Sequence, residues 1–167
     1  MARIQGSVAT LRVIGDELSP DEISSLLGSP ATIGRIKGEV VRGKKTSIEY
    51  TNKSGMWRLD ATDREPGNLD EQVIELLSKL TQDLAVWSSL KERFRLELFC
   101  GLFMEATNEG ATLSSDTLLA LGARGIELSL DVYCPIAELN GSDPCPCESG
   151  KAYGECCMPS ALQGINA

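Results

Sequence analysis

Residues 95–104, Arg-Leu-Glu-Leu-Phe-Cys-Gly-Leu-Phe-Met, are the stretch that best indicates how this chain folds. Apolar residues recur at every second position, and Arg95 and Glu97 occupy positions between them. Side chains of a β-strand point alternately to the two faces of a sheet, so this alternation predicts a strand with one buried face. The residues of that face are Leu96, Leu98, Cys100, Leu102 and Met104. We expect Cys100 to be a buried apolar residue and not a nucleophile.

Other stretches of the chain show a comparable strand pattern. Residues 7–14 predict a strand, and residues 126–133 alternate strictly, which predicts a strand with one solvent-facing side. In the first of these strands the core-facing residues are Ala9, Leu11 and Val13. Residues 46–51 and 55–60 predict a hairpin that turns at residues 52–54.

Helical segments with clear start signals lie between these strands. Ser19, Asn68 and Ser114 are predicted N-caps, and the first two begin capping boxes completed by Glu22 and Glu71. Apolar residues follow at helical spacing: Ile23, Leu26 and Leu27; Leu69, Val73, Leu76, Leu77 and Leu80; Leu84, Trp87 and Leu90; Leu118, Leu119 and Leu121. The order of elements predicts an α+β fold, with a mostly antiparallel sheet, helices packed on one face, and a ferredoxin-like first part.

The composition excludes several classes of function. The chain of 167 residues has a net charge of −8 and a pI of about 4.6, so we do not expect nucleic acid as the default partner. It contains no histidine, which removes every catalytic arrangement built on that residue. It has no apolar run of membrane-spanning length and no signal-peptide pattern at its start. We therefore expect a cytoplasmic protein of bacterial type; the sequence does not indicate its oligomeric state.

Residues 143–157, Asp-Pro-Cys-Pro-Cys-Glu-Ser-Gly-Lys-Ala-Tyr-Gly-Glu-Cys-Cys, contain four of the six cysteines. Four thiolates this close together suit a tetrahedral Zn²⁺ site, with iron as an alternative occupant. Disulfides would need an oxidising compartment, and adjacent cysteines rarely bridge each other. A segment this short cannot build an apolar core, so we expect one structural metal ion to hold it together. The expected ligands are Cys145, Cys147, Cys156 and Cys157.

About residues 143–158 resemble the SEC-C motif, the zinc-binding tail of the SecA preprotein translocase ATPase, which is also appended to many unrelated bacterial proteins. The resemblance implies that the four cysteines are the metal ligands. It also implies a docking role, because SEC-C tails contact a chaperone, the ribosome or lipid headgroups. The sequence departs from the motif at Glu148, where glycine is usual, and Lys151 remains from a group of common lysines. The positions that have lost them are Ala152, Gly154 and Glu155. Less positive charge weakens the inference of binding to RNA or anionic lipid.

About residues 6–133 resemble a bacterial family of unknown function, DUF4279. The matching positions are residues 9–16, 19–20, 27–28, 37–39, 55–57, 99–103, 108–110, 113–114 and 125–133. The resemblance implies no activity. The predicted organisation is an α+β domain at residues 1–134, a linker at 135–142 and the zinc-binding segment at 143–158.

Within this domain, Lys37, Glu39, Trp57 and Asn108 are candidates for a ligand or partner site. Lys37 and Glu39 share a face if their segment is extended, because side chains repeat every second residue. Trp57 would provide a flat apolar wall, and Asn108 a donor and an acceptor. The alternative is that Trp57 is a core residue, that the two charges form a solvated pair, and that residues 108–110 are a turn.

Three function classes follow from this sequence. The first is a non-catalytic binding or adaptor protein. Its body, residues 1–134, would recognise a protein or small ligand, and its zinc-binding segment would dock it elsewhere, with a protein partner on either part. The alternative is an immunity or antitoxin protein, whose acidic body masks a basic toxin surface. The third, a hydrolase or nuclease using Asp16, Asp60 and Asp63, ranks last because these acids are scattered and have ordinary surface explanations. We therefore do not expect an enzyme.

Overall fold

The computed structural model describes residues 3–42, 49–106, 108–134, 141–143, 145 and 149–156. Contacts within the chain divide it into two compact units, Met1–Cys134 and Pro135–Ala167. Residues 135–140 of the predicted linker lie outside the described residues. In the described part of the chain, no helix has both the length and the apolar character needed to cross a membrane.

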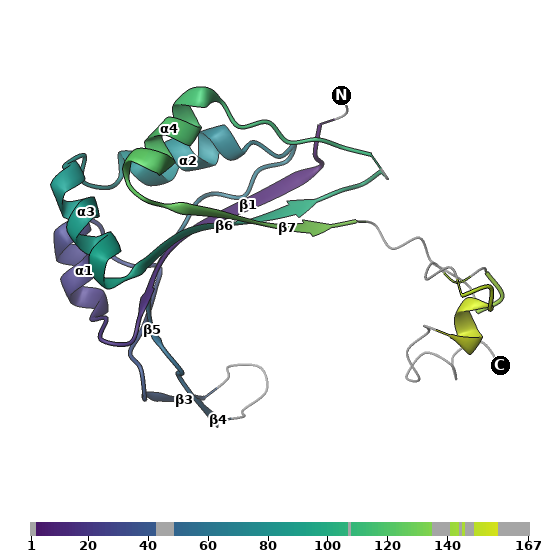
Figure 1. Ribbon diagram of the computed structural model, residues 1–167, viewed down its shortest axis with the longest axis horizontal. Helices are drawn as coiled ribbons and strands as arrows, with labels where there is room; N and C mark the ends of the chain where they lie inside the picture. Colours follow the sequence, from purple (N-terminus) through teal and green to yellow (C-terminus); the bar gives the residue numbers. More distant parts are fainter. Residues whose placement is uncertain are drawn as a thin grey trace. The chain divides into compact units, whose positions relative to one another are not determined.

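The first unit is built on a five-stranded sheet with the order β2-β5-β1-β6-β7 (Figure 1). The strands are β1 (Gly6–Gly15), β2 (Ile33–Arg35), β5 (Gly55–Asp60), β6 (Arg95–Phe103) and β7 (Glu127–Tyr133). Neighbouring strands are antiparallel except β6 and β7, which are parallel. The prediction of an α+β fold with a mostly antiparallel sheet is confirmed.

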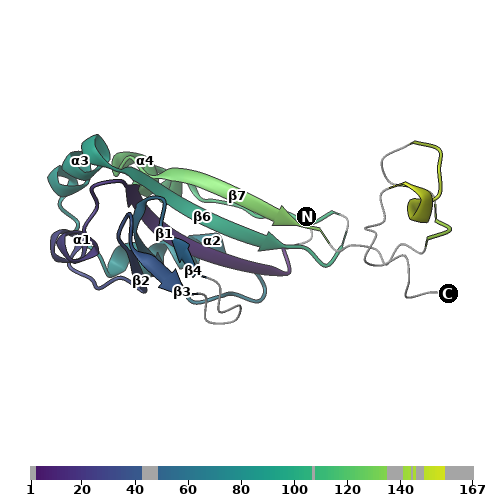
Figure 2. The same ribbon diagram turned by 90° about the horizontal axis from the view of Figure 1, so that it is seen from below.

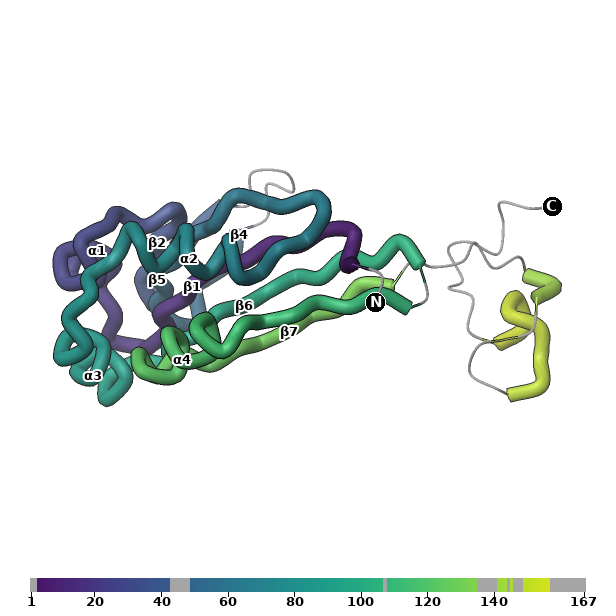
Figure 3. Tube along the Cα trace, turned by 90° about the horizontal axis from the view of Figure 1, so that it is seen from above, coloured from purple at the N-terminus to yellow at the C-terminus, as the bar shows by residue number. Residues whose placement is uncertain are grey.

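The helices are α1 (Pro20–Leu27), α2 (Leu69–Ser78), α3 (Leu84–Arg93) and α4 (Ser115–Ala123), and they lie over one face of the sheet (Figures 1 and 3). β1 and β2 are joined through α1, and β5 lies between them and antiparallel to both. This split β-α-β arrangement, continued by α2, α3 and β6, is the ferredoxin-like pattern predicted for the first part of the chain. α4 and β7 then extend the sheet by one parallel strand.

The predicted hairpin between residues 46–51 and 55–60 is wrong. β4 (Glu49–Thr51) pairs with β3 (Val40–Arg42) in a separate two-stranded sheet, whereas β5 pairs with β1 and β2. Trp57 and Leu59 of β5 are buried, while every residue of β4 is exposed. The apolar face of β5 is therefore buried when β5 lies inside the main sheet, between β1 and β2. β4 has no apolar face to bury, and it lies outside that sheet. Residues 46–48 lie outside the described residues.

The core lies between the sheet and the helices. The predicted inward residues of β1 and β6 are buried, except Met104, which follows the end of β6 and is partly buried. Trp57 and Trp87 are the largest fully buried side chains. Asn68 and Ser114 cap their helices as predicted, accepting the amide hydrogens of Glu71 and Thr117. The Ser19 side chain makes no capping hydrogen bond, so the predicted capping box at α1 is wrong. Leu26, which was predicted to face inward, is exposed. So are three other apolar residues noted at helical spacing: Leu84, Leu118 and Leu119.

Candidate functional site

The sheet has a second face, which no helix of the described body covers (Figure 2). Because directly paired residues share a face, the strand register assigns its members. Arg12 at its centre lies opposite Arg58 on one side and Glu97 on the other, and Thr10 lies opposite Asp60 and Phe99. The uncovered face therefore carries charged and aromatic side chains, while the helix-covered face of the same strands is apolar.

Glu97 is the buried acid of this uncovered face, with a side chain only 8% exposed. Its Oε1 accepts hydrogen bonds from Ser129 Oγ at 2.7 Å and from Arg95 Nη2 at 2.8 Å. Its Oε2 lies 3.6 Å from Arg12 Nη1. A buried carboxylate is costly unless it is paired and hydrogen-bonded, and these contacts supply both requirements. Glu97 therefore holds Arg12 and Arg95 in fixed positions on the uncovered face.

Arg12 also lies over an aromatic ring. Its guanidinium carbon is 3.9 Å from the centroid of Phe99, which is a cation–π distance. Arg12 Nε is buried and has no hydrogen-bond partner among the described residues. The guanidinium is thus held between the Glu97 carboxylate and the Phe99 ring, and its orientation is set before any partner binds.

Further aromatic and charged groups lie on the same face, toward the far end of β6 and on β5. The rings of Phe103 and Tyr133 stack with centroids 4.9 Å apart, and both residues are exposed. The Tyr133 hydroxyl donates to Asp131 Oδ2 at 2.6 Å, and this hydrogen bond to a carboxylate raises the pKa of Tyr133. Arg58 Nε lies 2.6 Å from Asp60 Oδ1. Arginines and acids alternate across the face, so its charges largely balance although the whole chain is strongly acidic.

The four residues predicted to form a binding pocket are not brought together. Lys37 pairs with Asp16, just beyond the end of β1, and Glu39 accepts a long 3.5 Å hydrogen bond from Asn52. Trp57 is fully buried, and its indole N–H donates to Ser24 Oγ at 3.0 Å. It is a core residue and cannot form an exposed wall, because it faces the helix-covered side of β5.

Asn108 lies at the other end of β1 from Lys37. The neighbouring Gly110 carbonyl accepts the Ile4 amide hydrogen at 3.1 Å, close to the start of that strand. β1 has ten residues, and a strand of this length extends roughly 30 Å. Lys37 and Asn108 therefore belong to opposite ends of the body.

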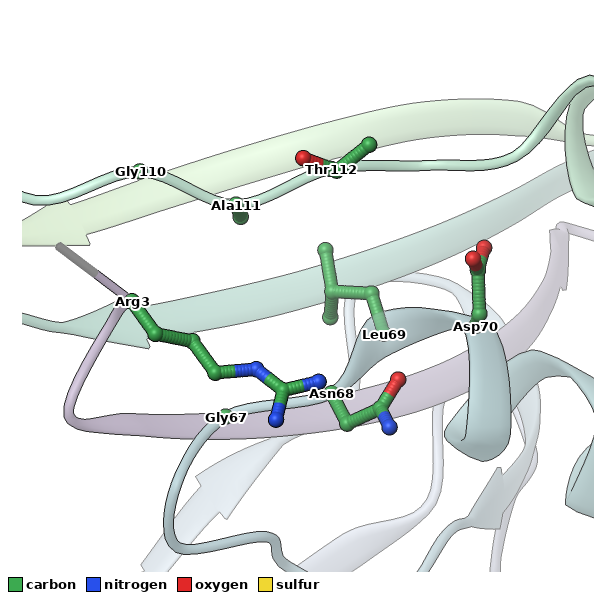
Figure 4. Close-up of a pocket in the computed structure, with 8 residues that line it drawn as sticks. All are labelled: Arg3, Gly67, Asn68, Leu69, Asp70, Gly110, Ala111 and Thr112. Carbon is green, nitrogen blue, oxygen red and sulfur yellow. The ribbon is translucent and has the colours of Figure 1, made fainter. Parts of the chain in front are cut away.

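A small polar pocket of about 320 Å³ lies near the Asn108 segment (Figure 4). Its walls are Arg3, residues 67–70 and residues 110–112. Several polar groups of the pocket are already hydrogen-bonded within the chain. Asn68 Oδ1 accepts the Glu71 amide hydrogen, and Asp70 accepts the amide hydrogen of Ser114. Arg3 reaches across the pocket toward Asn68 from an exposed position. These contacts connect the start of α2 with the segment before α4, which is a structural role.

A second hollow, missed by the sequence reasoning, lies between α2 and α4 with a volume of about 560 Å³. Val73 and Leu77 line it from α2, and Ala120 lines it from α4. Arg124 at one end is buried, and its guanidinium donates to the Ala120 carbonyl and to Gln82 Oε1. Burial and helix packing account for these residues, and no periodicity in the sequence distinguishes them from other helix-facing positions.

The second unit folds back on itself through main-chain hydrogen bonds. Cys145 N–H donates to the Lys151 carbonyl at 3.0 Å, and Tyr153 N–H donates to the Asp143 carbonyl at 2.8 Å. The turn includes Gly150 at φ 73°, a left-handed conformation that favours glycine. A short 3₁₀ helix, η1 (Tyr153–Glu155), precedes Cys156. The fold-back therefore brings the two ends of the cysteine-rich segment toward each other.

Of the four predicted metal ligands, Cys145 is buried and Cys156 is exposed. Ser149 Oγ donates to Cys156 Sγ at 3.3 Å, a contact that suits a thiolate. Cys147 and Cys157 lie outside the described residues, so no larger group of metal-binding side chains can be assembled from the described ones. The donor chemistry fits Zn²⁺, since four thiolates in one short segment match its preferred ligands.

Comparison with protein-family models gives two matches. Residues 4–135 match the domain of unknown function DUF4279, and residues 142–159 match the SEC-C motif. Curated proteins and solved structures give no match. The two matched regions follow each other in the predicted order.

Proposed function

Since this chain belongs to the DUF4279 family, whose name assigns it no activity, we propose its function from its own surfaces: it is a non-catalytic binding or adaptor protein. The body binds a protein partner on the uncovered face of its sheet. The C-terminal segment, held together by a structural Zn²⁺, docks the protein to a second site. The observation that carries the proposal is the fixed arrangement of Arg12 between Glu97 and Phe99 on a face that no described helix of the body covers.

The side chains of the uncovered face favour a protein as the partner. Arginine, tyrosine and phenylalanine are enriched at the centres of protein interfaces. Arg12 is already oriented by its two neighbours, so binding would cost little side-chain entropy there. The charges of the face largely balance, whereas nucleic-acid binding would need an excess of positive charge. Exposed Phe103 and Tyr133 add apolar contact area farther along the same face, six residues from Glu97 on β6.

The placement of acidic residues supports a non-catalytic role. Asp16 pairs with Lys37, and Asp60 pairs with Arg58 and accepts a hydrogen bond from Thr10. Asp16 follows the Gly15–Gly55 pair, and Asp60 lies at the far end of β5. Along β5, Gly55 and Asp60 are five residues apart, which corresponds to roughly 17 Å between the positions of Asp16 and Asp60. This separation is too large for Asp16 and Asp60 to act together on one bond.

The metal would serve the C-terminal segment as its core. Four cysteine thiolates would hold one Zn²⁺, with iron as an alternative occupant. A metal ion with four protein ligands has no open position at which to activate water, so its contribution would be to the fold. A folded segment presents a defined surface, which is what a docking module requires.

The proposal is tested by partner capture followed by reconstitution with purified proteins. The 167-residue chain is used to capture proteins from a bacterial lysate, and the affinity of the identified partner is then measured by calorimetry. We expect Arg12→Ala and Tyr133→Ala each to weaken binding roughly tenfold or more. The matched control is Ile74→Ala, because Ile74 is exposed on the helix-covered side.

Equal affinity for all these variants would overturn the assignment to the uncovered face. A partner that is a basic toxin, with growth inhibition relieved by this protein, would replace the adaptor function with the antitoxin alternative.

A further inference from the structure

β7 forms an edge of the five-stranded sheet. β6 is its only neighbour among the described strands, so its outer main-chain groups face away from the sheet. Natural proteins usually blunt such edges with charged side chains, especially lysine, or with proline, a bulge or a very short strand. β7 runs for seven residues, Glu-Leu-Ser-Leu-Asp-Val-Tyr, and contains neither proline nor lysine; its charged residues are Glu127 and Asp131. An edge strand of this kind is suited to pair with another strand.

The two sides of β7 differ in character. Leu128, Leu130 and Val132 lie on the helix side of the sheet, where their β6 partners Leu98, Cys100 and Leu102 are buried. Leu130 and Val132 are nevertheless each 51% exposed. α4 packs against β7 and adds exposed Leu118 and Leu119. Apolar surface is therefore left uncovered beside the free edge.

We infer that β7 pairs antiparallel with β7 of a second copy of this chain, across a two-fold axis that passes through the level of Leu130. The two five-stranded sheets would then form one continuous sheet. This inference does not depend on the proposed partner, because it concerns the edge of the sheet and not its uncovered face. It would, however, place the uncovered faces of both copies side by side.

The sequence of β7 is complementary to itself in this register. Leu130 faces its own symmetry mate, and Leu128 faces Val132. Glu127 faces Tyr133, and Ser129 faces Asp131, so each acid lies opposite a hydroxyl group and not opposite another acid. The pairing uses every residue of the strand and keeps apolar side chains opposite apolar ones. Cross-strand pairs of this kind stabilise an antiparallel ladder.

Neighbouring registers lack this complementarity. A shift of the pairing by two positions in one direction places Glu127 opposite Asp131, and a shift in the other direction places Asp131 opposite itself. Like charges directly opposite each other destabilise a ladder. A shift by one position would set the apolar side of one strand against the polar side of the other. The register centred on Leu130 is therefore more favourable than the neighbouring registers.

The symmetry also brings the helices of the two copies together. Because residues of even number face residues of even number, the helix-covered sides of both sheets lie on the same side of the joined sheet. The two α4 helices would flank the axis, each with its exposed leucines. Main-chain pairing over one short strand is a small contact, and this apolar surface enlarges it toward the size of a stable interface.

The register is tested by cysteine cross-linking of the 167-residue chain in a Cys134→Ser background, since Cys134 is exposed and directly follows β7. Directly opposite residues of an antiparallel pair have Cα atoms about 5 Å apart, within disulfide range. Leu130→Cys should therefore give a covalent dimer on mild oxidation. Leu128→Cys and Val132→Cys alone should not, because identical positions would lie four residues, or roughly 13 Å, apart. The double variant carrying both substitutions should cross-link again. The Cys134→Ser chain without added cysteines gives the background.

Sedimentation equilibrium provides the second measurement. At micromolar concentration, the unmodified chain should have a molecular mass of twice 18.0 kDa, that of a dimer. Leu130→Arg should shift it to the monomer mass, because two guanidinium groups would face each other at the axis. Leu130 is half exposed, so the variant should fold, which its thermal unfolding checks. A monomer at every concentration would overturn the proposal. The proposal would also be overturned if Leu130→Arg remained a dimer and Leu130→Cys gave no cross-link, because the dimer contact would then lie elsewhere.

Discussion

Glu97 and Glu127 both bind Arg95, but from different environments. The Glu97 side chain is 8% exposed and the Glu127 side chain 62% exposed, and both lie within 3.0 Å of the guanidinium. The two residues are directly paired across β6 and β7. The same ion-pair partner therefore serves one exposed carboxylate and one buried carboxylate, and the buried one also binds Arg12 and Ser129.

Glu97→Gln should destabilise the body by about 2 kcal/mol, because it removes a charge-assisted hydrogen-bond acceptor at a buried site and leaves Arg12 without its carboxylate. Glu127→Gln, the matched control, should change the free energy of unfolding only slightly, since exposed ion pairs contribute little. Urea unfolding monitored by tryptophan fluorescence measures both. Equal effects of the two substitutions would show that Glu97 does not hold the uncovered face together.

Glu75 on α2 should contribute to acid sensitivity. Lys79, the strongest influence, and Thr62 donate hydrogen bonds to its carboxylate and lower its pKa below the usual 4.5, against the opposing effect of burial. A carboxyl group whose pKa is lower in the folded state stabilises the fold above its unfolded pKa, and this contribution is lost as the pH falls through the folded value. Between pH 7 and pH 3, Glu75→Gln should therefore reduce the loss of stability measured by urea unfolding.

Glu71→Gln is the matched control for this experiment. Glu71 lies on the same helix, and its ion-pair contact with Arg64 spans 3.7 Å. If Glu75→Gln lost as much stability between pH 7 and pH 3 as the unmodified chain, the role assigned to the Lys79 and Thr62 contacts would be contradicted.

The regular elements of the body could be predicted because their signals are local. The alternation of β1 and β6, the caps at Asn68 and Ser114, and the order of elements all depend on residues close together in the chain. The hairpin error arose where a local signal competed with a distant one. The turn before β5 indicates pairing with β4. Burial of the apolar side chains of β5 instead requires a place in the main sheet, where β5 pairs with β1 and β2 and β4 pairs with β3.

The uncovered face could not be predicted in the same way. Arg12, Phe99 and Glu97 are ordinary surface residues in the sequence, and only the register of β1 and β6 places them together. The predicted pocket is wrong for a related reason: the distance between Lys37 and Asn108 depends on where β1 begins and ends, which the polarity of the two residues does not indicate. Strand register is a long-range property, and the periodicity of one strand does not determine it.

Gly28 and Gly122 should respond to alanine in opposite directions. Gly28 ends α1 with φ 80°, a left-handed conformation that alanine adopts at a cost of about 1 kcal/mol, so Gly28→Ala should lower the stability. Gly122 lies within α4, and an added Cβ would meet nothing there. Gly122→Ala should therefore raise the stability by about 0.5–1 kcal/mol, because alanine is the better helix former. Thermal unfolding of both variants checks the two signs, and the same sign for both would contradict the backbone argument.

The metal prediction can be tested without reference to any partner. Protein purified without added metal should contain about one Zn²⁺ per chain by elemental analysis, and Cys145→Ser should lose most of it, because three thiolates bind more weakly than four. Cys100→Ser is the matched control. Cys100 is fully buried in the core of the other unit, where burial raises the pKa of its thiol to about 12, so it is not part of the cysteine-rich segment that would hold the metal. Full occupancy in Cys145→Ser, or loss of metal in a folded Cys100→Ser, would contradict the assigned ligand set.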